Sequence, residues 1–433
     1  MFNPSSSPNQ NDTRWLPRFV TIWAGQAASQ FGSHLAQFAL VWWITLTTQS
    51  AVALTTATLV AILPSVVVMP FAGALVDRWN RRRVMLVTDT LSAVVAFVLA
   101  GLFVAEVAQL WHVYAAIFVR SILGAFQMPA MQASTSMLVP EAHLTRIGGM
   151  NQMLQGAIGI FAPAGGALML SIAPISAAMA IDVLTALMAV LPLLIVAIPQ
   201  PARQAAPGAH LPGPALLHEM REGFTVLAGN RGLVFIAVMS SLLNFLLTPT
   251  GALAPLLITR HFAGGAPELA LLEGAGGIGL VLGGLVMSAW GGFKRRIYTT
   301  IVGAVGIGTG IAVIGFAPAA AFGMAVAGMF LASVMQALAN GSVMAIFQSV
   351  IPKHAQGRVM ALLGTAAMGI SPLSLLIAGP LAETFGPRAW YIGAGLISIL
   401  VSLSGLLSRD VRALGAPSTA AKMTVASQVA SLT

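Results

Sequence analysis

Polar side chains that could bind a small molecule recur at helical spacing inside long apolar segments of this chain. The first such segment carries Gln26, Gln30, His34 and Gln37, at positions i, i+4, i+8 and i+11. That spacing places all four side chains on one face of a helix. The face could contact a substrate, or it could form hydrogen bonds to neighbouring helices, which also stabilise helix bundles in membranes.

Three other apolar segments carry polar residues of the same kind. They are Arg120 with Gln127, Asn244 with Thr248, and Gln336 with Asn340. A charged side chain in hydrocarbon is costly, so Arg120 should face a cavity or a partner unless it reaches the outer membrane interface. Together the four segments indicate a polar site enclosed by helices.

Ionisable groups inside apolar segments are the candidates for carrying protons. The buried ones are Asp182, Glu273, His34 and Asp89. Asp182 and Glu273 each lie about two turns from the outer end of a segment, so either could instead be an interfacial carboxylate. His34 titrates near neutral pH, but it could act only as a hydrogen-bonding partner. Asp89 follows the arginine run 81–83, and we expect it to pair with that run in a gate.

The composition indicates an integral membrane protein. Of the 433 residues, 57% are hydrophobic and 8% are charged, whereas a soluble domain carries roughly 25% charged residues. Apolar stretches of about 20 residues, enough to cross a bilayer, recur along nearly the whole chain. We expect twelve membrane-spanning helices, or eleven if one Pro/Gly-split pair forms a single helix. The segments are 17–46, 51–76, 84–106, 110–137, 147–171, 175–199, 231–259, 268–292, 297–317, 320–349, 357–381 and 388–408.

The distribution of basic residues predicts the orientation in the membrane. With the N-terminus in the cytoplasm, all but three of the 21 Lys and Arg residues fall on the cytoplasmic side. The exceptions are Arg260 and Arg388 outside and Arg120 within a span. This bias follows the positive-inside rule, so we expect both termini in the cytoplasm and the protein in the inner membrane.

Several classes of function are disfavoured by what the sequence lacks. The net charge of +9 is spread between spans and forms no patch for nucleic acid. There is no cysteine, no metal-ligand spacing, no Ser/His/Asp set and no phosphate-binding loop, so we expect neither an enzyme nor a bound metal or cofactor. Residues 1–13 show no signal-peptide pattern.

The chain divides into two similar halves. The Pro-rich stretch 200–230, with an amphipathic helix at 216–224, forms a predicted cytoplasmic linker between bundles 14–199 and 231–412, and 1–13 and 413–433 form tails. Gly73-Ala74-Leu75-Val76 matches Gly283-Gly284-Leu285-Val286 at an offset of 210, and Pro140 with Arg146 matches Pro352 with Arg358 at an offset of 212. Near-constant offsets favour a duplicated six-helix unit.

One loop carries a specific signature. Its residues are Gly73-Ala74-Leu75-Val76-Asp77-Arg78-Trp79-Asn80-Arg81-Arg82-Arg83. The run resembles the major facilitator signature G-x-L-x-D-R-x-x-R-R. Gly73 should allow close helix approach, and the resemblance implies that Asp77 faces a helix N-terminus of the other half, starting near Gly357, in one transporter state. Positive-inside anchoring alone would explain the arginines but not Gly73 and Asp77.

Further motifs extend the resemblance over nearly all of residues 14–412. Arg120-Ser121-Ile122-Leu123-Gly124 resembles the family's R-x-x-x-G motif, which links Arg120 to proton coupling. Ala162-Pro163-Ala164-Gly165-Gly166-Ala167 is similar to the antiporter motif, with alanine for two glycines, and could equally mark tight helix packing. The segment from Gly357 to Gly386 resembles the branch containing macrolide-efflux proteins and the enterobactin exporter. In the family, the four polar segments line one central cavity.

These observations predict a secondary transporter with two pseudo-symmetric six-helix bundles. We expect proton-coupled efflux of amphiphilic small molecules, such as drugs or siderophore-like compounds, by a monomer in the lipid bilayer. One alternative is a lipid or lysophospholipid flippase, which would scramble labelled lysophospholipid. Another is a membrane sensor that does not transport, for which replacing Arg120 and Gln336 would alter signalling alone.

Overall fold

The computed structural model describes residues 15–76, 78–196, 224–351 and 353–414. The tail 1–13, the residue Asp77, nearly all of the predicted linker helix and the chain beyond 414 lie outside the described residues. The described residues are almost entirely helical and contain no strand, which confirms the all-α prediction.

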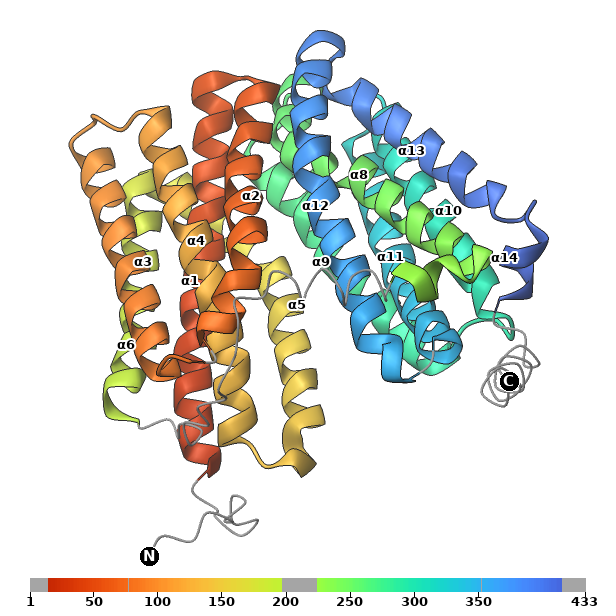
Figure 1. Ribbon diagram of the computed structural model, residues 1–433. Coiled ribbons are helices and arrows are strands. Elements are labelled where there is room, and N and C mark those ends of the chain that lie inside the picture. The colour runs from red at the N-terminus through yellow and green to blue at the C-terminus, as the bar shows by residue number, and fades with distance from the viewer. Residues whose placement is uncertain (1–14, 77, 197–223, 352, 415–433) are drawn as a thin grey trace, which may run out of the picture. The chain divides into compact units, whose positions relative to one another are not determined.

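Two compact units divide the helices between them (Figure 1). Unit 1 comprises Met1–Thr48 and Ala57–Leu211, and unit 2 comprises Gln49–Thr56 and Pro212–Thr433. Unit 1 holds α1 (Trp15–Thr48), most of α2 (Ala51–Val76), α3 (Arg81–Val104), α4 (Leu110–Leu138), α5 (Glu141–Ile172) and α6 (Ile175–Ile195). Unit 2 holds α8 (Arg231–Arg260), α9 (Ala266–Trp290), α10 (Arg296–Phe316), α11 (Phe322–Val350), α12 (Lys353–Phe385), α13 (Pro387–Ser404) and the short α14 (Arg409–Ala413). The domain boundaries given above remain predictions.

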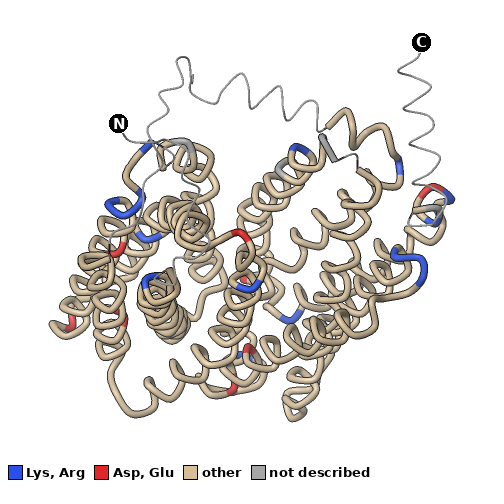
Figure 2. Tube along the Cα trace, turned by 90° about the horizontal axis from the view of Figure 1, so that it is seen from below, with Lys and Arg blue, Asp and Glu red and all other residues tan. Residues whose placement is uncertain are grey.

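The long helices are suited to a bilayer. Among the described residues, 10 helices are long and apolar enough to cross a membrane. The two remaining long helices are α1, whose polar stripe and tryptophans lower its hydropathy, and α13, which begins with Pro387 and Arg388. Figure 2 shows how sparse charged residues are along the helices. This multi-pass arrangement is consistent with the twelve predicted spans.

The predicted repeat is visible in the packing of each unit. In unit 1, α1 packs on α5 and α6, and α3 packs on α4 and α6. In unit 2, α8 packs on α12 and α13, and α10 packs on α11 and α13, which is the same pattern. The helices α4, α5 and α6 begin at residues 110, 141 and 175, and α11, α12 and α13 begin 212 residues later, at 322, 353 and 387.

One pair of hydrogen bonds repeats with the helices. The Arg81 guanidinium donates to the Ala133 carbonyl at 3.3 Å, and the Arg296 guanidinium donates to the Ala345 carbonyl at 3.0 Å. Each arginine is the first residue of its helix, and each acceptor lies near the C-terminal end of the next helix. Ala133 and Ala345 each lie five residues before the last residue of their helix, so each arginine fastens the start of its own helix to the next helix just before its final turn.

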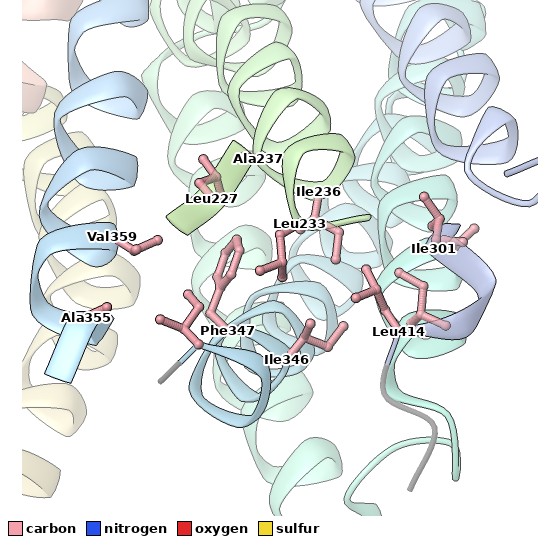
Figure 3. Packing of buried hydrophobic residues seen from close by; sticks show 13 residues of the cluster. Leu227, Leu233, Ile236, Ala237, Ile301, Ile346, Phe347, Ala355, Val359 and Leu414 are labelled. Atoms are coloured by element: carbon pink, nitrogen blue, oxygen red, sulfur yellow. The ribbon is translucent and has the colours of Figure 1, made fainter. Parts of the chain in front are cut away.

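The largest apolar core described lies at one end of unit 2. Figure 3 shows Leu233 and Ile236 of α8 gathered with Ile346 and Phe347 of α11. Leu414, just after α14, is buried in the same cluster, and α14 is capped by the Ser408 hydroxyl, which accepts from the Val411 amide. The short helix therefore fastens the end of the described chain to α8.

Candidate functional site

Three helices of unit 1 bring together a buried amide and carboxylate network, the amide layer. Nε2 of Gln26 donates to the Asp89 carboxylate at 2.7 Å, and Nε2 of Gln127 donates to its other oxygen at 2.9 Å. The same Gln127 nitrogen also donates to Oε1 of Gln26 at 2.9 Å, and the Thr88 hydroxyl donates to Oε1 of Gln127. Gln26 is only 3% exposed and Asp89 only 7%, so these two side chains depend on their neighbours in the layer for hydrogen bonds.

The expected pairing of Asp89 with the arginine run is wrong. The Asp89 carboxylate accepts from the amides of Gln26 and Gln127, while Arg81 and Arg82 bind backbone carbonyls at helix ends. Asp89 lies eight residues beyond Arg81 on the same helix, which is about 12 Å along the axis. At that distance the carboxylate lies deep in the bundle, next to the polar stripe of α1.

A second cluster, the charged layer, contains an ion pair. Arg120 on α4 binds the Asp182 carboxylate on α6, and its other terminal nitrogen donates to the Ser33 hydroxyl at 2.8 Å. The Ser33 hydroxyl in turn donates to Asp182 at 2.9 Å. The side chains of Arg120 and Asp182 are 22% and 3% exposed, so the pair lies mainly inside unit 1. A charged side chain inside a membrane is energetically costly unless it is paired, and Asp182 pairs with Arg120.

The two layers are stacked along the same pair of helices. Ser33 follows Gln26 by seven residues on α1, and Gln127 follows Arg120 by seven residues on α4. Seven residues are almost two full turns, about 10 Å of rise, so both partners return to the same face. Because α1 and α4 run in opposite directions, Ser33 meets Arg120 at one level and Gln26 meets Gln127 at the other. The charged layer therefore forms one end of the stack, and the amide layer forms the other.

The rest of the α1 stripe separates into bonded and exposed members. Gln30 accepts from the Gln155 amide of α5 at 2.8 Å, whereas His34 and Gln37 are exposed. On the neighbouring stretch of α5, a Cβ added at Gly166 would lie 2.6 Å from the Phe38 ring. The Gly165-Gly166 pair thus permits close contact between α1 and α5, which favours the packing interpretation of that motif.

Two of the four polar residues predicted in unit 2, Asn244 and Thr248, form hydrogen bonds within α8. The Asn244 amide donates to the Ser240 carbonyl at 3.0 Å, and the Thr248 hydroxyl lies 3.3 Å from that of Ser371 on α12. Gln336 and Asn340 of α11 are both exposed.

Glu273 on α9 is half-buried. Within the described ranges, no hydrogen bond or ion pair reaches its carboxylate, in contrast to Asp89 and Asp182.

The signature loop is described except for Asp77. The Arg82 guanidinium donates to the carbonyls of Leu193 and Leu194 at 2.5 and 2.7 Å, at the end of α6. Arg78 and Arg83 are exposed. A Cβ added at Gly73 would meet nothing within 4 Å among the described residues, so the expected close helix approach at Gly73 is absent from this conformation.

Comparison with known proteins identifies the family. The family model described as Major Facilitator Superfamily matches residues 22–374. The chain belongs to the Major Facilitator Superfamily. It is 32% identical over 400 residues to macrolide efflux protein A of Streptococcus pyogenes, covering 92% of this chain and 98% of that protein. It is 25% identical over 425 residues to the multidrug efflux pump Tap of Mycolicibacterium fortuitum, covering 93% and 98%.

Solved structures agree with this fold at low sequence identity. A POT family transporter in complex with a thioalcohol-conjugated peptide matches with a TM-score of 0.71 and 11% identity, covering 90% of this chain and 96% of the other. A nucleoside transporter matches with a TM-score of 0.66 and 14% identity, covering 88% and 98%. This protein is therefore a major facilitator transporter with several membrane-spanning helices.

Sequence reasoning missed three members of the site in this superfamily transporter. Ser33 bridges Arg120 and Asp182, Thr88 binds Gln127, and Gln155 binds Gln30. Ser33 lies seven residues after Gln26, so the periodicity of the α1 stripe contained a signal for it. Thr88 and Gln155 lie on α3 and α5, so the periodicity of the α1 stripe carried no signal for them.

Proposed function

We propose that this transporter couples proton movement to the efflux of amphiphilic small molecules by alternating access. Its relatives named for macrolide and multidrug efflux support the substrate class. The observation that carries the proposal is the charged layer, an ion pair inside a helix bundle. Ionisable groups at such depth are costly and usually mark transport pathways or proton relays.

The charged layer offers a way to connect protonation with movement. A proton placed on Asp182 removes its negative charge, which releases Arg120 from the ion pair and leaves Ser33 as its remaining partner. Arg120 can then interact with another group, so the state of α4 relative to α6 depends on proton occupancy. Glu273 and His34 remain further candidates for carrying protons.

The exposed polar residues are proposed to contact substrate. In unit 1 these are His34 and Gln37, and in unit 2 they are Asn244, Gln336 and Asn340. All five are amides or an imidazole, which suit hydrogen bonds to an amphiphile with several polar groups. The bonded residues Gln26, Gln30, Gln127 and Thr248 would support this surface. The protein is proposed to act as a monomer in the inner membrane, with both termini in the cytoplasm.

Transport in proteoliposomes tests the coupling. We expect uptake of erythromycin or ethidium into vesicles with an acidic interior to exceed uptake into vesicles without a pH gradient. A protonophore should abolish the difference, and protein-free vesicles provide the background. If an imposed pH gradient changes the flux of no compound in a panel of amphiphiles, proton antiport is wrong. Scrambling of labelled lysophospholipid would support the flippase alternative instead.

The signature loop gives a direct prediction. Replacing Asp77 by asparagine should reduce efflux strongly, because the family resemblance places this carboxylate against a helix N-terminus, where negative charge is stabilising. Membrane insertion should be normal, as measured by expression and elution from a size-exclusion column. Asp410→Asn, a change in the short α14, serves as the control and should leave efflux unchanged. Equal efflux by the Asp77→Asn variant and the control would remove Asp77 from the gate.

A further inference from the structure

The loop between α9 and α10 presents two aromatic side chains at the surface of unit 2. The rings of Trp290 and Phe293 pack edge to face, with their centroids 4.8 Å apart. The two side chains are nevertheless 48% and 45% exposed. At the ends of membrane helices, tryptophan is enriched at the boundary between lipid headgroups and acyl chains. The aromatic pair therefore indicates that this loop contacts the membrane surface.

Two basic side chains directly follow the aromatic pair. Lys294 and Arg295 are exposed, and within the described ranges neither side chain forms a hydrogen bond or an ion pair. The next residue, Arg296, differs because it donates to the Ala345 carbonyl. Residues 274–382 contain no aspartate or glutamate, so no acidic residue nearby in the sequence offsets the positive charge of the loop.

Two glycines hold the loop in a defined conformation. Gly291 and Gly292 have φ of 73° and 84°, which glycine adopts without steric cost. The Gly291 amide donates to the Met287 carbonyl at 2.8 Å, and the Phe293 amide donates to the Thr299 hydroxyl at 2.8 Å. A Cβ added at Gly292 would lie 2.8 Å from the same hydroxyl. The direction in which the aromatic and basic side chains leave the loop is therefore fixed by the backbone.

The corresponding loop of unit 1 uses its side chains differently. There Arg81 and Arg82 both bind backbone carbonyls of other helices, and Trp79 stacks on Phe126 of α4. In the α9–α10 loop the aromatic partner comes from the loop itself, and only one of three consecutive basic side chains binds a carbonyl. The second copy of the loop thus carries groups that unit 2 does not use to hold its own helices together.

We propose that Trp290, Phe293, Lys294 and Arg295 form a lipid site that binds the headgroup of an anionic phospholipid. The ammonium and guanidinium groups bind the phosphate, for which the arginine fork is suited, and the aromatic pair lies beside the first part of the acyl chains. Positive-inside anchoring accounts for the two basic side chains but not for the aromatic pair or the turn built from glycines. An anionic lipid fits better than a zwitterionic one, because the loop offers two positive charges and no carboxylate for an ammonium headgroup.

A lipid titration of the purified full-length protein in detergent tests the lipid site. Dioleoylphosphatidylglycerol should raise the unfolding temperature at lower concentrations than dioleoylphosphatidylcholine, because a ligand that binds the folded state stabilises it. Lys294→Gln with Arg295→Gln should weaken the affinity for phosphatidylglycerol about 25-fold, from about fivefold for each basic side chain at an anionic surface. This double variant should no longer prefer phosphatidylglycerol to phosphatidylcholine. An unchanged preference would overturn the proposal.

A matched double variant controls for net charge. Arg409→Gln with Arg412→Gln removes the same charge from two exposed arginines of α14, which lie outside the loop. We expect the affinity for phosphatidylglycerol to stay the same in this control. An equal loss in both double variants would show that the lipid responds only to the net charge of the protein, and the lipid site would be wrong.

The aromatic pair and a free anion provide two further measurements. Trp290→Ser with Phe293→Ser should weaken the affinity for both lipids and keep the preference for phosphatidylglycerol; unchanged affinities would contradict the proposed site. Inorganic phosphate should not raise the unfolding temperature, since it offers no acyl chain to the aromatic pair. Protection by phosphate alone would identify a site for soluble anions and overturn the proposal. None of these measurements needs a transported compound, so a failure of proton-coupled efflux would leave their result unaffected.

Discussion

Replacing Arg120 by methionine should stop efflux and lower the free energy of unfolding by about 3 kcal/mol, as expected when one partner of a buried ion pair is removed. Asp182 would remain 3% exposed with the Ser33 hydroxyl as its remaining polar partner. The value lies at the lower end for buried pairs because the Arg120 side chain keeps 22% of its exposure. Thermal unfolding in detergent and efflux from vesicles measure the two effects.

A second substitution distinguishes stability from transport. The double variant Arg120→Met with Asp182→Leu removes both charges and should recover most of the lost stability, since apolar replacements of a buried pair are often neutral or stabilising. Efflux should remain lost, because the charged layer then contains no group that can exchange a proton. If the double variant transports normally, the charged layer serves only to hold α4 and α6 together.

Arg388 provides a matched arginine outside the charged layer. Its Nε donates to the Gly315 carbonyl at 2.7 Å, with no carboxylate involved in that contact. Arg388→Met should cost about 1 kcal/mol, as for an ordinary hydrogen bond, and leave efflux intact. A loss of efflux similar to that in Arg120→Met would show that removing an arginine is generally harmful in this protein.

Hydrophobic periodicity and composition were enough to predict those features of the fold that depend on a single helix. The apolar segments predicted the long helices because a bilayer requires about 20 apolar residues for each crossing. The repeat of short motifs at offsets of 210 and 212 predicted a duplication, and the later helices of each unit begin 212 residues apart. Of the stripe on α1, Gln26 and Gln30 both bind residues of other helices, which is the hydrogen-bonding alternative for that face.

The hydrogen-bonding partners of the buried polar residues could not be predicted. They depend on how each helix is rotated about its axis and on the depth of each residue within the bundle. Asp89 was expected to pair with nearby arginines along the chain, yet its partners come from α1 and α4. The sequence also does not show that Arg120 of α4 reaches Asp182 of α6, which lies 62 positions away. The bond from the Ala51 amide, at the start of α2, to the Glu383 carboxylate of α12 is an extreme case, because the two residues are 332 positions apart in the sequence.

The packing of the glycines in the two sequence motifs could not be predicted from the sequence either. A Cβ added at Gly166 would lie 2.6 Å from the Phe38 ring, whereas one added at Gly73 would meet nothing within 4 Å in the described part of the chain. Their sequences alone could not distinguish the two situations. A glycine that permits close contact in one transporter state has no contact to reveal in another, so the role of Gly73 in the gate stays a prediction.

The amide layer gives the second large expected effect. Asp89→Leu removes the acceptor shared by Gln26 and Gln127 and leaves their amide nitrogens poorly satisfied inside the bundle. We expect a loss of about 2–4 kcal/mol, from about 1–3 kcal/mol for each unsatisfied group, reduced because Gln127 keeps its bond to Gln26. Thermal unfolding in detergent measures this loss.

Asp89→Asn separates the charge of this residue from its shape. The asparagine keeps the size of the side chain, but its amide nitrogen would face the amide nitrogen of either Gln26 or Gln127, so we expect a loss of about 1 kcal/mol. If Asp89 contributes only packing, efflux by this variant should equal that of the unmodified protein at every pH gradient. If its charge takes part in transport, Asp89→Asn should abolish most of the efflux although it costs only about 1 kcal/mol of stability. The triple change of Gln26, Asp89 and Gln127 to leucine should then restore the free energy of unfolding but not efflux. That combination of a stable bundle and lost efflux is what we expect, because an apolar core can replace the hydrogen bonds of the layer but not a charge that changes during the cycle.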